Sequence, residues 1–282
     1  MEGLIRRVRR ATKDRPARAW VADNPLTATA TDLTVGAGDI GNFKEAGKEL
    51  CFDDGTDELV ITTGAADSTT NKITMVRGQD GTAGTEHVQA TAVLIKPRFT
   101  NAEIIDAIST VIDNLLWPKI WVPAETTLAY QSTNDYFSPT LPGIDEIGLA
   151  YQLVSGGFYK IAAEVVRAPF ADDANFPNGA IIISSTVDSS TIYLSVHLRP
   201  AVDNLDIEAE NLTVAGASAL LVEAEEMAHV GGATTAVDKT VADGSKLRAG
   251  VVLMQRFENM LDRRRVALAS AEQQRRHELL GV

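Results

Sequence analysis

The segment from Lys72 to Leu116 constrains the fold of this chain most, because four structural elements follow one another there without a break. A β-type run at residues 73–76 leads into a turn with two glycines, and a second apolar run follows at residues 92–95. Pro97–Phe99 then connects directly to a helical pattern. We expect a strand, a turn, a strand and a helix, in which residues 77–100 form one rigid elbow.

The helix expected over residues 100–116 has a start signal and an apolar stripe. Thr100 can cap its N-terminus, Glu103 lies at the capping-box position, and Pro118 ends the pattern. The stripe repeats every three or four residues and consists of Ile104, Ile105, Ile108, Val111, Ile112, Leu115 and Leu116. Such a stripe has to be buried. Either the chain's own β modules cover it, or it is an assembly helix that meets its copy in a neighbouring subunit.

The residue types in the elbow have structural uses. Gly78 and Gly81 can adopt positive φ, and Arg77 can direct its five donors to carboxylates or carbonyls at the end of the β module. Pro97 keeps the chain extended, and Phe99 precedes the helix cap, where a hydrophobic staple contacts the first turn. We expect a structural role for the elbow residues Arg77, Gly78, Gly81, Thr82, His87, Pro97 and Phe99.

The order of these residues resembles the RG-x-x-GT…H…V…PRF segment of structural proteins in tailed-bacteriophage virions, found in neck, collar and fibre-base proteins. The resemblance extends over about residues 24–116. It implies a virion protein that assembles in the host cytoplasm as a homo-oligomeric ring at the head–tail neck. Its expected partners are portal, adaptor, tail or fibre subunits, with packaged DNA nearby. The resemblance transfers no catalytic residue.

The chain as a whole is predicted to be α+β and mainly β, with two small barrel or sandwich modules joined by an amphipathic helix. In the first module, strands are expected at 30–35, 49–52, 58–62, 72–76 and 92–96. In the second module they are expected at 148–154, 159–166, 180–187 and 191–198, and helices follow at 217–228 and 243–280. The resulting regions are a basic arm (1–18), a β module (19–98), a connecting helix (99–118), a second β module (119–212) and a helical region (213–282).

Charge is distributed unevenly along the chain. The net charge of −12 argues against nucleic-acid binding by the whole surface, yet both ends are basic. Residues 6–18 carry seven cations, and the tail contains Arg263–Arg265 and Arg275–Arg276. We expect both ends to insert into acidic surfaces of neighbouring subunits, with packaged DNA as the rival partner. A disordered tail is the alternative for the arm, whose docking residues are Arg6, Arg7, Arg9 and Arg10.

The sequence predicts neither an enzyme nor a cofactor or metal site. Gly36–Gly41 spells G-x-G-x-x-G, but a dinucleotide site needs a following helix, and none is expected there. Asp80, Glu86 and His87 could hold a metal, although a polar structural turn is the favoured interpretation. Cys51 is the single cysteine and is expected to be buried, and no apolar run approaches the ~20 residues of a membrane helix. Metalloprotease spacing is absent among His87, His197, His229 and His277.

The second β module supports an alternative function, a tail-fibre base or baseplate protein that displays a receptor- or glycan-binding domain. Aromatic side chains can stack on sugar rings, and the candidates are Trp117, Trp121, Tyr130, Tyr136 and Tyr151. Their favoured interpretation is core or interface. A hydrolase of host-wall polymers is a third possibility, which the missing acid–nucleophile pair disfavours.

Overall fold

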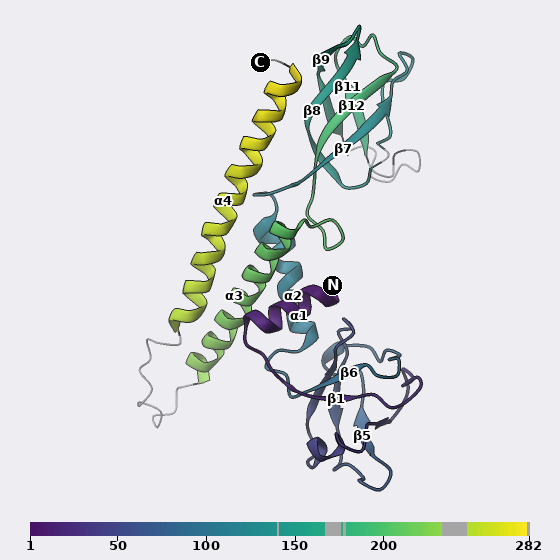
Figure 1. The fold of residues 1–282 in the computed structure, drawn as a ribbon, viewed down its shortest axis with the longest axis vertical. Coiled ribbons are helices and arrows are strands. Elements are labelled where there is room, and N and C mark those ends of the chain that lie inside the picture. Colours follow the sequence, from purple (N-terminus) through teal and green to yellow (C-terminus); the bar gives the residue numbers. More distant parts are fainter. Residues whose placement is uncertain (140, 167–175, 177–178, 233–246, 281–282) are drawn as a thin grey trace. The chain divides into compact units, whose positions relative to one another are not determined.

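The computed structural model describes residues 1–282 except 140, 167–175, 177–178, 233–246 and 281–282. The fold is α+β, as predicted, with several sheets and a helical C-terminal region (Figure 1). The chain forms two compact units, which are Met1–Val111 with Glu210–Glu258 and Ile112–Ala209 with Asn259–Val282. This division differs from the predicted regions, because the arm belongs to the first unit and the helical C-terminal region is shared between both.

The first unit contains a six-stranded antiparallel sheet in the order β1-β6-β3-β4-β5-β2. Its strands are β1 Ala17–Trp20, β2 Asp32–Thr34, β3 Glu49–Phe52, β4 Leu59–Thr62, β5 Lys72–Val76 and β6 Ala92–Ile95. A short 3₁₀ turn, η1 Ile40–Phe43, lies between β2 and β3. One side of the curled sheet encloses the core, including Leu33, Phe43, Leu50, Phe52, Ile73 and Val93.

Strand β6 is buried along its whole length, because apolar side chains cover both of its faces. Val93 and Ile95 enter the main core, whereas Leu94 packs with Cys51 and Leu59 on the other side. Cys51 is thus buried, as predicted, and burial raises the pKa of its thiol.

Helices α1 Glu2–Ala11 and α2 Asn101–Thr110 belong to the same unit. The capping box predicted for α2 is present, since Glu103 N–H donates to Thr100 Oγ1 and Thr100 N–H donates to Glu103 Oε2. The α-helix ends earlier than predicted, and residues Val111–Leu116 form a π-helical segment, η3. There the N–H of Trp117 donates to the carbonyl of Ile112, five residues earlier, which widens the turn.

The second unit contains an antiparallel sheet in the order β7-β12-β8-β9 and a two-stranded sheet of β10 and β11. Ser155 and Gly156 have positive φ and close a two-residue hairpin between β8 and β9. The strands are β7 Val122–Ala129, β8 Ile144–Val154, β9 Gly157–Ile161, β10 Ala163–Val166, β11 Ala180–Ile183 and β12 Thr191–Leu198. Their core includes Ile144, Ala150, Ile181, Ile192, Leu194 and Val196.

Two long helices complete the fold, α3 Ile207–Gly232 and α4 Leu247–Leu280. Helix α3 starts ten residues before the predicted Ala217, because Asp206 caps it by accepting from the N–H of Ala209. Among the described residues, the helices lack the combination of length and apolarity that crossing a membrane requires.

Candidate functional site

The side chain of Arg77 is only 7% exposed and joins several segments of the elbow by hydrogen bonds. Its Nε donates to Glu58 Oε1 at 2.7 Å and its Nη2 to Glu58 Oε2 at 2.6 Å, which is a bidentate pair. Its guanidinium also donates to the carbonyls of Thr27 and Thr85. Arg77 therefore reaches a carboxylate and two carbonyls, as the sequence predicted.

The imidazole of His87 is fully buried between two carboxylates and stacks on Phe52 at a centroid distance of 3.5 Å. Its Nδ1 lies 2.6 Å from Asp54 Oδ2, and its Nε2 lies 2.9 Å from Glu58 Oε2. Ionised carboxylates only accept hydrogen bonds, so both ring nitrogens must donate and the ring is an imidazolium. Burial alone would lower the pKa of His87, but the hydrogen bonds to Asp54 and Glu58 outweigh it and raise the pKa.

The two carboxylates of this network are held ionised. Burial opposes charge on Glu58, yet hydrogen bonds from Arg77, His87 and the N–H of Thr85 lower its pKa to about 2. Burial likewise opposes charge on Asp54, and the hydrogen bond with His87 lowers the pKa. Two cations thus balance two anions, and we call Asp54, Glu58, Arg77 and His87 the elbow network.

The glycine turn depends on backbone conformations that other residues rarely adopt. Gly78 has a φ of 60°, and a Cβ there would lie 2.8 Å from the carbonyl of Thr82. Gly81 has a φ of 79° but open space around it. The Thr82 hydroxyl accepts from the N–H of Leu59 and donates to the carbonyl of Gln79, so it ties the turn to β4.

The alternative of a metal site at the turn gains no support from this geometry. Both ring nitrogens of His87 already face carboxylates, whereas a ligand histidine must offer a lone pair. In the described part of the chain, no three His, Cys, Asp or Glu side chains are grouped as metal ligands.

The predicted docking arm is an integral helix, and the assignment of Arg9 to docking is wrong. Arg9 is 4% exposed, forms an ion pair with Asp14 and donates to the carbonyl of Phe99 and to Asn101 Oδ1, both at 2.8 Å. Asn101 Nδ2 donates to the carbonyls of Phe52 and Thr56, both at 2.7 Å. Sequence reasoning missed Asn101, because an asparagine in the first turn of a helix carries no signal of such distant partners.

Two other arginines of α1 also have partners in their own unit. Arg6 pairs with Glu2 and Asp53, and Arg7 pairs with Glu210. The opposite face of α1 is apolar and buried through Leu4, Ile5 and Val8.

Two further elbow residues, Pro97 and Phe99, are buried just before α2 begins. Their neighbour Arg98 joins the elbow to other helices. Arg98 pairs with Glu225 on α3, donates to the carbonyl of Thr12 at 2.7 Å, and its N–H donates to Asp14 at 3.0 Å.

The apolar stripe of the predicted assembly helix is covered by the chain itself. Ile104, Ile108 and Val111 are fully buried and Ile112 is 4% exposed, whereas Ile105 and Leu115 are partly buried. On α3, Gly216 lets this packing approach closely, because a Cβ there would lie 2.9 Å from Val111 and 3.0 Å from Phe257. The stripe therefore needs no neighbouring subunit to bury it.

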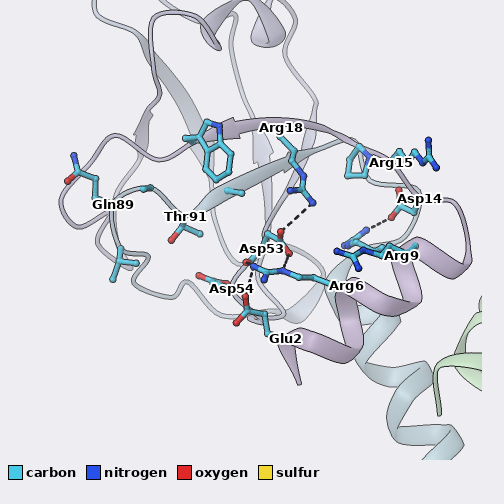
Figure 2. A pocket seen from close by; sticks show the side chains of 16 residues that line it. Glu2, Arg6, Arg9, Asp14, Arg15, Arg18, Asp53, Asp54, Gln89 and Thr91 are labelled. Carbon is cyan, nitrogen blue, oxygen red and sulfur yellow. Dashed lines mark hydrogen bonds and ion pairs between the residues drawn. The ribbon is translucent and has the colours of Figure 1, made fainter. Parts of the chain in front are cut away.

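A pocket of about 640 Å³ opens between α1 and β1 in the first unit. Figure 2 shows Arg6 and Arg18 directed at Asp53 from these two elements. Asp54 also lines this pocket, so the elbow network reaches its wall, and Trp20 on β1 is 50% exposed beside it. We call this cavity the arginine pocket.

In the second unit, the C-terminal part of α4 packs on the sheet. Ser195 and His197 on β12 meet this helix: His197 Nε2 lies 3.2 Å from Glu272, and Arg275 donates to Ser195 Oγ. The basic tail is therefore largely paired internally, since further ion pairs join Arg264 to Asp206 and Glu208, Arg275 to Glu125 and Arg276 to Glu272.

The predicted sugar-stacking aromatics do not form one site. Trp121 stacks on His197, and Tyr130 stacks on Phe137 beside the core. Tyr151 instead stacks on Tyr193 at 5.3 Å and meets the exposed ring of Phe158. Trp117 is partly buried at the end of η3, and Tyr136 is 43% exposed.

The sequence matches no protein-family model, and a search of curated proteins finds no match. In the elbow network, the imidazole, the guanidinium and both carboxylates are satisfied by one another, so none is left poised to abstract or deliver a proton.

Proposed function

We propose that this chain is a structural protein of a tailed-bacteriophage virion, where it forms an oligomeric ring or collar at the head–tail neck. It bridges the portal to the tail or anchors collar fibres. The observation that carries the proposal is the elbow network, since Arg77 and His87 belong to the segment that resembles virion proteins and both are committed to internal contacts.

A rigid elbow is what a ring subunit requires. In a closed ring, each subunit is rotated by the same fixed angle relative to its neighbour. A deviation in the shape of the subunit is therefore repeated at every position of the ring. The elbow network fixes the turn before β6, and the Arg9–Asn101 contact fixes the start of α2 on the same module. The elbow network and the Arg9–Asn101 contact are both buried and hydrogen-bonded, which limits the bending of this part of the subunit.

Labelling of assembled particles tests the proposal. Antibodies raised against the recombinant chain, applied to particles purified from the strain that encodes it, should place gold at the head–tail junction in electron micrographs. Mass spectrometry of the same particles should detect the chain. Particles that lack the chain in both measurements would contradict the proposed function.

A tail-fibre base with a glycan-binding module is the second candidate, favoured by one aromatic surface in the second unit. Tyr151 stacks on Tyr193 and meets Phe158 edge-on at 5.4 Å, and Phe158 is 42% exposed. Exposed rings of this kind can stack on sugars. Binding of the chain to a glycan array, lost in Phe158→Ala but kept in Trp20→Ala, which removes an exposed ring of the other unit, would favour this candidate over a neck ring.

A further inference from the structure

The arginine pocket contains more cations than its own carboxylates neutralise. It is lined by five arginines and four acids, and each acid has a partner. Asp14 pairs with Arg9 and Asp54 with His87, while Arg6 and Arg18 share Asp53 and Arg6 also meets Glu2, as Figure 2 shows in part. Internal pairing thus accounts for every anion of the pocket.

Two arginines remain open to a ligand. Arg10 and Arg15 both line the pocket and both are exposed. Within the described ranges of the chain, neither guanidinium has a hydrogen bond or an ion pair. The pocket also offers the half-exposed indole of Trp20, against which the apolar stem of a ligand side chain can pack.

The chemistry of the open arginines selects a carboxylate-bearing ligand. Guanidinium forks match carboxylates and phosphates. Duplex DNA carries one charge per about 1.7 Å, far more than two open cations neutralise. An acidic peptide segment brings separate carboxylates on short stems, which suits a pocket of about 640 Å³.

We propose that the arginine pocket binds an acidic segment with two neighbouring carboxylates from a second copy of this chain, through Arg10 and Arg15. Charge complementarity identifies the occupant, since the chain has 38 acidic and 26 basic residues and so presents surplus carboxylates to any copy beside it. The inference rests on the proposed ring, for which it supplies a contact between subunits.

The ligand chemistry is tested by calorimetric titration of the full chain with a hexaglutamate peptide at low salt. The variant Arg10→Gln/Arg15→Gln should bind about tenfold more weakly, since each exposed pair contributes modestly. Lys44→Gln/Lys72→Gln removes the same charge elsewhere in the unit and should bind like the wild type. No binding by the wild type, or equal binding by the pocket variant, overturns the proposal. So does binding of duplex DNA that the same variant loses.

The occupant is tested by sedimentation velocity of the chain alone. Self-association of the wild type should weaken in Arg10→Gln/Arg15→Gln and in the presence of hexaglutamate, with unchanged melting temperatures showing intact folds. A wild type that stays monomeric, or self-association unaffected by either change, overturns a second copy as the occupant. Gold labelling of virions is independent of these results. The binding and sedimentation experiments can therefore contradict the proposed pocket ligand while the labelling supports the proposed neck position, or the labelling can contradict the neck position while the pocket ligand is supported.

Discussion

Nε2 of His87 and Oε2 of Glu58 lie 2.9 Å apart, and neither side chain is exposed to solvent. The folded chain therefore keeps a proton on His87 that the unfolded chain releases near the ordinary pKa of 6.5. Folding and proton binding are coupled at this pair, which makes the stability of the elbow dependent on pH.

We predict that the chain loses stability as pH rises above neutrality. Because the pKa of His87 is raised in the fold, its stabilisation is complete below 6.5 and is lost as pH rises through the folded pKa. Glu58 acts in the opposite sense: its stabilisation is present above 4.5 and is lost as pH falls toward about 2. Urea unfolding from about pH 5.5 to about pH 9 measures the alkaline limb. His87→Asn should be less stable and should flatten this limb, and an unchanged slope would contradict the charged imidazole.

Gly78→Ala should destabilise the chain more than Gly81→Ala. Both positions have positive φ, which costs a residue with a Cβ about 1–2 kcal/mol. Only at Gly78 does the added Cβ also meet a backbone carbonyl, that of Thr82, at 2.8 Å. Thermal unfolding of the two variants gives the ranking, and equal losses would show that the turn can move aside. The sequence already predicts harm from Gly81→Val, through φ alone.

Asn101→Ala should cost about 2–4 kcal/mol of unfolding free energy, because it leaves the carbonyls of Phe52 and Thr56 and one donor of Arg9 unpaired in a buried site. Chemical denaturation measures the loss. Asn42→Ala changes an exposed asparagine of the same unit and serves as the control. A similar small effect of both substitutions would mean that water replaces the lost partners.

Ile5→Asp should destabilise the first unit by several kcal/mol, since Ile5 is 2% exposed and its new charge would be buried without a partner. Gly3→Asp introduces the same charge into the exposed first turn of α1, where it faces the positive end of the helix, and should be tolerated. Melting temperatures compare the two variants. Equal stability would show that α1 can leave its place in the unit without unfolding it.

Local signals predicted the elements that local physics fixes. Thr100 and Glu103 lie three residues apart, so the capping box of α2 is readable in sequence. Strands β3 to β6 stand out because compact apolar runs are bounded by turn residues. Strands β1 and β7 escaped prediction, since Arg18 and Glu125 interrupt any apolar pattern and pairing with β6 and β12 decides their conformation.

Only some residues of the candidate site could be predicted from the sequence. The residue types of Arg77 and Gly78 indicate a fork of hydrogen-bond donors and a left-handed turn. Nothing in the local sequence identifies Glu58 or Asp54 as the partners of Arg77 and His87. Arg9 shows the limit most clearly. A run of arginines near the N-terminus indicates a solvated face, and only contacts with residues about 90 positions away bury one of them.

The close packing of Val111 and Phe257 around Gly216 has a consequence for protein synthesis. The ribosome completes residues 1–111 well before residues 210–258 of the same unit, a delay of roughly 5–20 s at typical elongation rates. During that interval the apolar end of the helix on the nascent chain lacks its cover. Premature termination or proteolysis between residues 111 and 210 would therefore yield an aggregation-prone fragment with an exposed apolar helix end.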